Sequence, residues 1–155
     1  MRSTLVVVLS MLAAAPVLAQ EEAAVTARIG EFAAAWNRHD VKGMVATFAE
    51  DSDLISPFGR WAKGRKYVEA LFQDDHQTVM KESTYTLMRS EVRLLGPTYA
   101  ISDWECEITN MRGPQGETLP PFKHHVTVVH AKRDGQWFAL AARPYAFVPA
   151  PAPAR

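Results

Sequence analysis

The residues best suited to chemistry fall in the last strand-like segment of the sequence, residues 136–147. Because side chains alternate between the two faces of a strand, one face of this segment carries Trp137, Ala139, Ala141, Arg143 and Tyr145. Small side chains in succession leave space in a sheet, as a small-molecule cavity requires. If this face points inward, Arg143 is costly to bury without a partner. We therefore expect Arg143 to hold an anionic or carbonyl group of a ligand, or to form a structural ion pair with Asp53 or Glu50.

Five histidines are candidate proton carriers, because histidine changes charge near neutral pH. His124 and His125 are neighbours in one strand-like segment and point to opposite faces, so at most one of them enters a pocket. His76 ends a helix-like segment and can face the same pocket. His39 directly precedes a helix start, where a solvated or capping role is expected.

The spacing of these residues does not match a metal site. His130 shares a face with His124, but six residues of extended strand separate the two by about 20 Å, too far for one ion. A site built from His76, Asp53 and His124 lacks a spacing motif such as His-x-x-x-His, and the chain has no Gly-x-Gly-x-x-Gly nucleotide-binding fingerprint. We therefore expect neither a metal nor an organic cofactor. The single cysteine, Cys106, allows no internal disulfide and is expected to be a small buried residue.

Three carboxylates, Asp103, Glu105 and Glu107, alternate along one face of another strand-like segment. Such a row suits acid–base chemistry or a cation site. It also suits a solvated or dimer-facing surface, on which charged side chains of the neighbouring segment, Arg89, Glu91 and Arg93, form cross-strand charge pairs with them. The second interpretation is preferred.

Several large aromatic side chains can line either a core or a ligand pocket. Trp36 and Trp104 lie at inward positions of a helix pattern and a strand pattern. Phe58 and Trp61 belong to a short predicted hairpin and are expected at a pocket rim. We take these four residues, with Ala139 and Ala141, as the candidate ligand-binding set.

The first half of the sequence predicts three helices. Apolar residues recur at helical spacing over 21–37, and a second short helix follows over 41–48 with Asp40 as its N-cap. A brief strand over 53–56 and its return over 60–63 form a hairpin, and a third helix runs over 64–76.

The second half predicts four long strands, since branched and aromatic residues dominate segments that turn signals separate. They span 84–95, 99–111, 122–133 and 136–147. Helices followed by consecutive antiparallel strands indicate an α+β fold with the helices on one face of the sheet.

The two ends of the sequence predict export and a disordered tail. Residues 1–19 have the charge, apolar run and small residues of a cleavable secretory signal, with cleavage after Ala19. Their apolar run is about half of the roughly twenty residues that a membrane span needs. Residues 20–148 then form one domain, and the Pro-Ala segment 149–155 is expected to be disordered. We expect a periplasmic or secreted protein without a stable membrane anchor.

The charge balance argues against a nucleic-acid-binding role. Removal of residues 1–19 takes away Arg2 alone among charged side chains and leaves 16 Lys and Arg against 17 Asp and Glu. A net charge near zero provides no electrostatic attraction for nucleic acid or anionic lipid. A small organic molecule is therefore the expected partner.

The order of these elements, with several local motifs, resembles the SnoaL-like, nuclear-transport-factor-2-like superfamily, which includes ketosteroid isomerase, scytalone dehydratase and small polyketide cyclases. The motifs are residues 32–40 (FAAAWNRHD), 48–52 (FAEDS), Gly64-Arg65 and 134–137 (DGQW). The resemblance implies a cone in which a curved antiparallel sheet wraps around three N-terminal helices, with a pocket at the wide end. It also implies that the Trp137 face of the last strand points inward, and that the outer sheet face forms a homodimer.

A shared fold does not determine a function. Comparison with the catalytic positions of ketosteroid isomerase argues against steroid isomerisation. Ketosteroid isomerase carries its aspartate base directly before Pro-x-Gly, where this sequence has Ser56. A serine hydroxyl does not abstract a proton from carbon near neutral pH without stronger activation. The isomerase's oxyanion-binding tyrosine aligns with Phe32, which offers no hydrogen-bond donor.

Two functions remain open from the sequence. The first is a cofactor-independent acid–base enzyme, an isomerase, dehydratase, cyclase or hydrolase, in which Tyr145, His124 or His76 carries protons and Arg143 stabilises developing negative charge. The second is a ligand-binding or dimerisation module without catalysis. Catalysis predicts that at least two residues of one set converge on one cavity: Asp53, His76, His124, Arg143 and Tyr145. Scattered placement of the set favours the module without catalysis.

Overall fold

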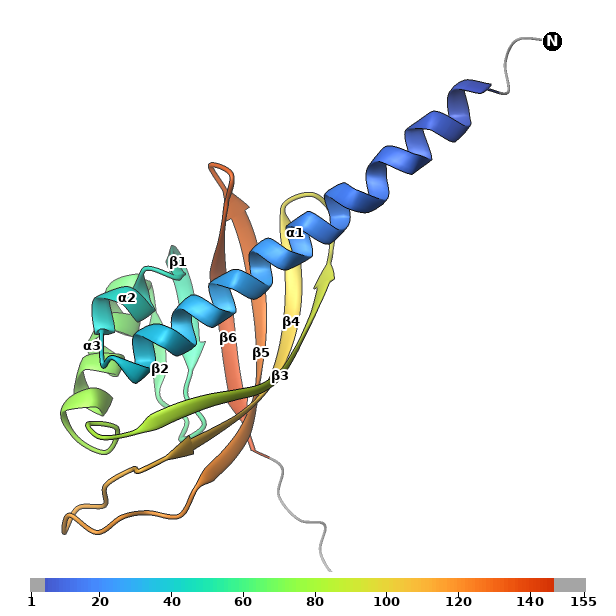
Figure 1. Ribbon diagram of the computed structural model, residues 1–155. Coiled ribbons are helices and arrows are strands. Elements are labelled where there is room, and N and C mark those ends of the chain that lie inside the picture. The colour runs from blue at the N-terminus through green and yellow to red at the C-terminus, as the bar shows by residue number, and fades with distance from the viewer. Residues whose placement is uncertain (1–4, 147–155) are drawn as a thin grey trace, which may run out of the picture.

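The computed structural model describes residues 5–146, with side chains from residue 16 onward (Figure 1). The predicted signal segment lies only partly within this range. The predicted Pro-Ala tail over 149–155 lies outside the described residues. No helix in the described part of the chain combines the length and apolarity that crossing a membrane requires.

Three helices precede or interrupt the first strands. They are α1 (Leu5–Asn37), α2 (Val41–Val45) and α3 (Arg65–Gln77). The α1 helix begins well before the predicted start at residue 21, because residues 5–20 are rich in Ala and Leu, which favour helix. The predicted N-cap is confirmed, since the Asp40 carboxylate accepts a hydrogen bond from the Gly43 amide at 2.9 Å.

Six strands form one curved, open sheet in the order β2-β1-β6-β5-β4-β3. Their bounds are β1 (Phe48–Ile55), β2 (Trp61–Lys63), β3 (Thr84–Leu94), β4 (Tyr99–Thr109), β5 (Phe122–Arg133) and β6 (Gln136–Tyr145). Neighbouring strands are antiparallel except β1 and β6, which run parallel. The predicted α+β class and the four long strands are therefore confirmed.

The second helix is shorter than predicted, and the first strand is longer. The α2 helix ends at Val45, and Phe48 starts β1 instead of closing the helix. The Thr47 hydroxyl donates to the Met44 carbonyl, which satisfies a group at the helix end. Phe48 then packs against Phe32 with ring centroids 6.2 Å apart, so burial of its ring fixes it in the strand.

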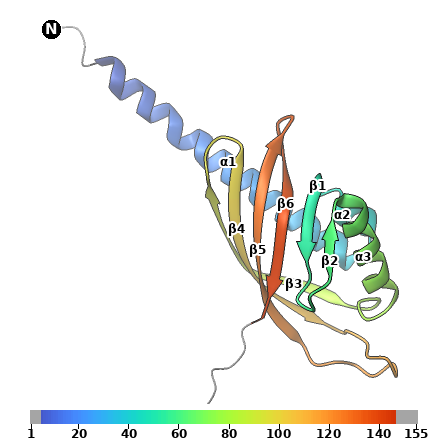
Figure 2. The same ribbon diagram turned by 180° about the vertical axis from the view of Figure 1, so that it is seen from behind.

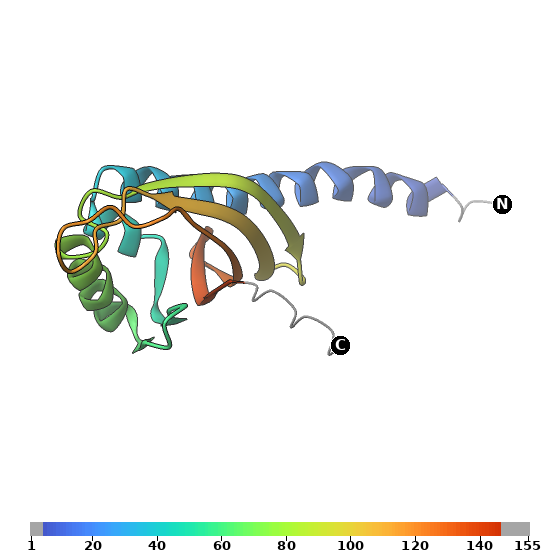
Figure 3. The same cartoon turned by 90° about the horizontal axis from the view of Figure 1, so that it is seen from below.

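The helices lie on the concave side of the sheet, and the core fills the space between them (Figure 3). Figure 2 shows the opposite side, on which no described helix crosses β4, β5 or β6. Phe32 is central to the core, because its ring lies within 6.2 Å of the rings of five other aromatic residues: Trp36, Phe48, Phe72, Tyr85 and Trp104.

Candidate functional site

A cavity of about 90 Å³ lies between the helices and the concave face of the sheet. Its walls are mostly apolar and come from α1, α3 and every strand except β2. The polar side chains among its lining residues are Arg28, Thr47, Ser56, Asp75, Tyr85, His124 and His130, beside the indole rings of Trp36 and Trp104. Small side chains on β6, Ala139 and Ala142, leave the space open.

The cavity opens beside the turn that joins β1 to β2. Phe58 in this turn lines the cavity and is 73% exposed. Its ring stacks on Phe122, which in turn stacks on His124, with centroids 6.0 and 5.0 Å apart. This aromatic stack forms one side of the opening, as the expected rim position of Phe58 requires.

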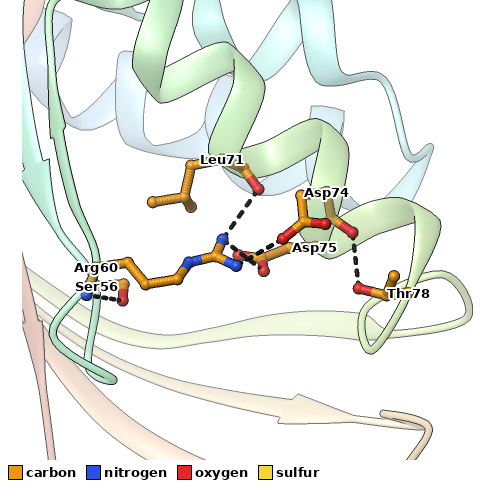
Figure 4. Close-up of polar contacts among 6 residues, drawn as sticks. All are labelled: Ser56, Arg60, Leu71, Asp74, Asp75 and Thr78. Atoms are coloured by element: carbon orange, nitrogen blue, oxygen red, sulfur yellow. Dashed lines mark hydrogen bonds and ion pairs between the residues drawn. The ribbon is translucent and has the colours of Figure 1, made fainter. Parts of the chain in front are cut away.

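Near the same turn, an arginine is bound to two carboxylates (Figure 4). Arg60 Nη1 donates to Asp74 Oδ2 at 2.7 Å, and Nη2 donates to Asp75 Oδ1 at 2.9 Å. Asp75 lines the cavity and keeps 22% of its side chain exposed. Burial raises the pKa of Asp75, while Arg60 opposes that rise. Ser56 lines the same region and accepts a hydrogen bond from the Arg60 amide.

Tyr85 lies in the cavity wall at a position that α1 fixes. The Asn37 side chain donates to the Tyr85 carbonyl and accepts from the Tyr85 amide, at 2.9 and 2.7 Å. The Tyr85 hydroxyl is buried and has no hydrogen-bond partner among the described residues. Burial raises the pKa of Tyr85 well above its usual value, and the neighbouring Cys106 thiol adds to the effect. Tyr85 is therefore neutral, and the Cys106 thiol beside its hydroxyl is only a weak hydrogen-bond partner.

His124 is a weakly held imidazole in the cavity wall. Its Nε2 lies 3.5 Å from the Cys106 sulfur, a weak hydrogen-bonding partner, and its Nδ1 lies 3.5 Å from the Phe122 carbonyl oxygen, a long contact. Burial lowers the pKa of His124. Burial also raises the pKa of Cys106 to about 11, so the thiol is protonated and does not act as a nucleophile. This agrees with the expected structural role of the cysteine.

A second histidine, His130, lines the cavity within a buried polar chain. Trp104 Nε1 donates to the Ser102 hydroxyl, which lies 2.8 Å from His130 Nε2. The Ser102 hydroxyl has no other acceptor among the described residues, so it is assigned as the donor to His130 Nε2. The proton of the neutral ring then lies on Nδ1. Burial lowers the pKa of His130 to about 4. His130 is thus a neutral part of the core.

The inward face of β6 differs from the prediction in its second half. Opposite β5, Val129 pairs with Ala141 but His130 pairs with Ala139, so Leu140 is an extra residue that forms a β-bulge. A bulge shifts the alternation by one position. Trp137 and Ala139 point inward as predicted. The prediction is wrong for Ala141, Arg143 and Tyr145, which the structure places on the outer face. 

Beyond the bulge, the inward positions of β6 belong to Ala142 and Pro144, which line the cavity. On the outer face Arg143 forms an ion pair with Asp53, with 40% and 37% of the two side chains exposed. Tyr145 stacks on His125 on the same face, with centroids 5.7 Å apart.

Two further candidate residues lie away from the cavity. His76 is buried, with its Nδ1 3.0 Å from His39 Nδ1 and its ring 4.6 Å from that of Trp36. Burial lowers the pKa of His76 to about 4, and His39 adds to the effect. Trp61 is exposed on β2, with the Lys63 ammonium 5.4 Å from its ring centre. Neither residue lines the cavity.

Of the five predicted catalytic residues, the structure brings His124 alone to the cavity. Of the six predicted ligand-binding residues, Trp36, Phe58, Trp104 and Ala139 line it. Sequence reasoning missed Asp75 and Tyr85, although a signal existed for each. Asp75 follows the buried Val68 and Leu71 at helical spacing, and Tyr85 occupies an inward position of β3. No group of three or more His, Cys, Asp or Glu side chains in the described part of the chain is arranged to hold a metal ion.

Known proteins share this architecture. An uncharacterized protein with a cystatin-like fold from Caulobacter vibrioides superposes with a TM-score of 0.74 at 21% identity, over 81% of this chain and 89% of that one. A ketosteroid isomerase-like protein from Erwinia carotovora atroseptica superposes with a TM-score of 0.72 at 21% identity, over 83% of this chain and 98% of that one. An NTF2-like protein of unknown function from Pseudomonas putida gives 0.72 at 18% identity, over 85% and 90%. At these identities the likeness shows the fold.

A search among curated proteins gives no match. A family model described as the SnoaL-like domain matches residues 29–140, which include α2, α3, β1 to β5 and most of the packed part of α1. The resemblance noted from the sequence motifs is therefore confirmed, and the protein belongs to the SnoaL-like domain family.

Proposed function

We propose that this protein binds a small, largely apolar organic molecule in the cavity between its helices and the sheet. The observation that carries the proposal is the cavity itself, which Ala139 and Ala142 leave open in an otherwise packed core. Apolar walls with a few polar groups are typical of small-molecule sites. The polar groups near the opening, Asp75 and His124, then orient the ligand.

The size of the cavity limits the ligand. A volume of 90 Å³ is smaller than the roughly 150 Å³ of an apolar cavity that admits benzene, so a ring-sized ligand requires lining side chains to move. Phe58 is 73% exposed and lies in a turn, so its displacement costs little buried surface. We expect ligand binding to shift Phe58 away from Phe122.

Binding without catalysis is the function that the geometry supports best. Arg143 and Asp53 are paired on the outer face, His76 contacts His39, and Tyr145 stacks on His125. A cofactor-independent acid–base enzyme is the second candidate. One observation favours it: the half-buried Asp75 carboxylate, with its raised pKa, and the neutral Tyr85 hydroxyl line one cavity.

A thermal-shift screen against apolar and aromatic small molecules tests binding, because a ligand specific for the folded state raises the melting temperature. The bulge provides a matched pair of variants. Ala142→Leu fills the cavity and should abolish the shift, whereas Ala141→Leu adds the same atoms to the outer face and should preserve it. Equal ligand shifts in both variants would place the ligand elsewhere.

We also propose that the protein is exported, with cleavage after Ala19 giving a periplasmic or secreted domain. Residues 16–20 are exposed, whereas Glu21 accepts hydrogen bonds from Lys132 and Trp137 at 2.6 and 2.8 Å. Cleavage at the proposed bond therefore leaves the first tertiary contacts of α1 intact. The intact mass of protein from the periplasmic fraction tests this, and a chain that retains Met1 would contradict it.

A homodimer through the outer sheet face is part of the same proposal. This face carries cross-strand neighbours of opposite charge, such as Arg89 opposite Glu105, and no described helix covers β4 to β6 on that side (Figure 2). Light scattering on the purified protein measures the oligomer. Glu105→Arg replaces a negative charge on this face by a positive one, so it disturbs the charge pattern that two copies of the face would have to match and should weaken the dimer. A dimer of unchanged strength in this variant would show that another face forms the interface.

A further inference from the structure

The charges at the cavity opening indicate which ligands fit it. Asp74, Asp75 and Arg60 together carry a net charge of −1 at neutral pH. Arg60 directs its guanidinium to both carboxylates and to the Leu71 carbonyl, so three of its five N–H donors are engaged and its charge is paired with theirs (Figure 4). The opening therefore presents carboxylate oxygen to a ligand and offers no free cation.

One oxygen of Asp75 remains available. Arg60 binds Oδ1, and Oδ2 forms no hydrogen bond with any described residue. Asp75 lines the cavity, and 22% of its side chain is exposed. An ionised carboxylate oxygen accepts hydrogen bonds and cannot donate them. The opening is thus equipped to accept a hydrogen bond from a ligand.

The one positively charged residue that lines the cavity, Arg28, does not change the charge at the opening. Arg28 is the one Lys or Arg among the lining residues, all of which are described. Its guanidinium donates to the Trp137 carbonyl, the Ala46 carbonyl and the Glu31 carboxylate. A ligand carboxylate would meet Asp75 at the opening without a free cation to compensate for it.

An independent observation marks the same cavity as a polar ligand site. Tyr85 is 4% exposed, lines the cavity, and holds a hydroxyl without a hydrogen-bond partner among the described residues. A buried hydroxyl without a partner is costly in the unliganded protein. A ligand oxygen that accepts a hydrogen bond from Tyr85 would remove that cost.

We propose that the ligand is a small apolar molecule bearing a hydroxyl or amino group, and that this group donates a hydrogen bond to Asp75 Oδ2 at the cavity opening. The proposal rests on the binding function proposed above and specifies its ligand class. It reverses the charge preference expected from Arg143, because an acidic opening selects against carboxylates and favours donors.

Four monocyclic probes of similar size test the selectivity: benzyl alcohol, benzylamine, toluene and benzoate. Dissociation constants come from ligand-observed NMR titrations at pH 7. Benzyl alcohol and benzylamine should bind about tenfold more tightly than toluene, since a hydrogen bond to a charged group is stronger than one between neutral groups and partial exposure reduces the gain. Benzoate should bind most weakly.

Asp75→Asn removes the charge and keeps the shape, and Asp74→Asn is the matched control, because Asp74 also binds Arg60 but does not line the cavity. Asp75→Asn should weaken benzylamine binding about tenfold. Asp74→Asn should change it less than twofold.

The outcomes separate this proposal from the proposed function. If toluene binds as tightly as benzyl alcohol to the unmodified protein, or if the two variants behave alike, the role of Asp75 is refuted while the binding cavity stands. If none of the four probes binds, both are refuted. The probe series on the unmodified protein decides the matter even if Asp75→Asn fails to fold.

Discussion

Replacing Tyr85 by Phe should stabilise the unliganded protein. The Tyr85 hydroxyl is buried without a hydrogen-bond partner, and such a group costs about 1–3 kcal/mol. The Cys106 thiol lies beside it, but a thiol is a weak partner and offsets only part of that cost. Phe keeps the ring and its contact with Phe32 at 5.9 Å. We expect the free energy of unfolding to rise by about 1 kcal/mol, or about 3 °C in melting temperature.

Urea denaturation followed by tryptophan fluorescence measures this change, since Trp36 and Trp104 belong to the same core. Tyr67→Phe is the control: Tyr67 is exposed, so loss of its hydroxyl should change stability by less than about 0.5 kcal/mol. The same Tyr85→Phe variant should bind benzyl alcohol several-fold more weakly, because it loses a donor in the cavity wall. Stability and affinity then change in opposite directions.

A destabilised Tyr85→Phe protein would refute the reasoning. A loss of 1 kcal/mol or more, about the value of an ordinary intramolecular hydrogen bond, would show that the hydroxyl has a good partner in the folded protein. Unchanged affinity for benzyl alcohol would show that the hydroxyl does not reach the ligand.

Two further predictions concern buried histidines and the outer face. Burial lowers the pKa of His76 and His130 to about 4, whereas an unfolded histidine titrates near 6.5. The unfolded chain therefore binds more protons below pH 6.5, and stability should fall towards pH 4 by about 1.4 kcal/mol per pH unit for each histidine. Urea midpoints between pH 7.5 and 5 measure the slope, which His130→Phe should reduce by up to about 1.4 kcal/mol per pH unit, the contribution of one histidine. Arg143→Ala removes a partly exposed ion pair, so it should cost at most about 1 kcal/mol and leave ligand affinity within twofold. A tenfold loss of affinity in that variant would contradict this prediction, because it would show that Arg143 contributes to ligand binding.

The fold was predictable from the sequence because its signals are local and repeated. The helical spacing that ends at Trp36, the Asp40 cap and the turn signals at Gly96 and Gly135 each specify one element. Errors are confined to boundaries where tertiary contacts decide. Phe48 fits a helix pattern, but burial against Phe32 places it in β1.

The site was less predictable, because one residue changed the faces of a strand. Strict alternation assigns Arg143 to the interior, and nothing in the sequence around Leu140, such as a glycine, marks the bulge. The role of Asp75 depends on the distance to Arg60 across two elements, which spacing along the chain does not encode. Four of the six predicted ligand-binding residues nevertheless line the cavity, since large aromatic residues at inward positions line cavities and cores alike.

The bulge at Leu140 makes the faces of β6 depend on the register of its last residues. If residues 141–145 slid by one position along β5 and the bulge disappeared, strict alternation would turn Ala142 and Pro144 outward and Arg143 inward, opposite the acidic opening. A register slip, without any substitution, would thereby convert a site suited to hydrogen-bond donors into one suited to anions. Deletion of Leu140 would instead leave Arg143 outside, because the residues on the two sides of the bulge would keep their present faces. The register of this strand is therefore informative when SnoaL-like structures are compared for ligand preference.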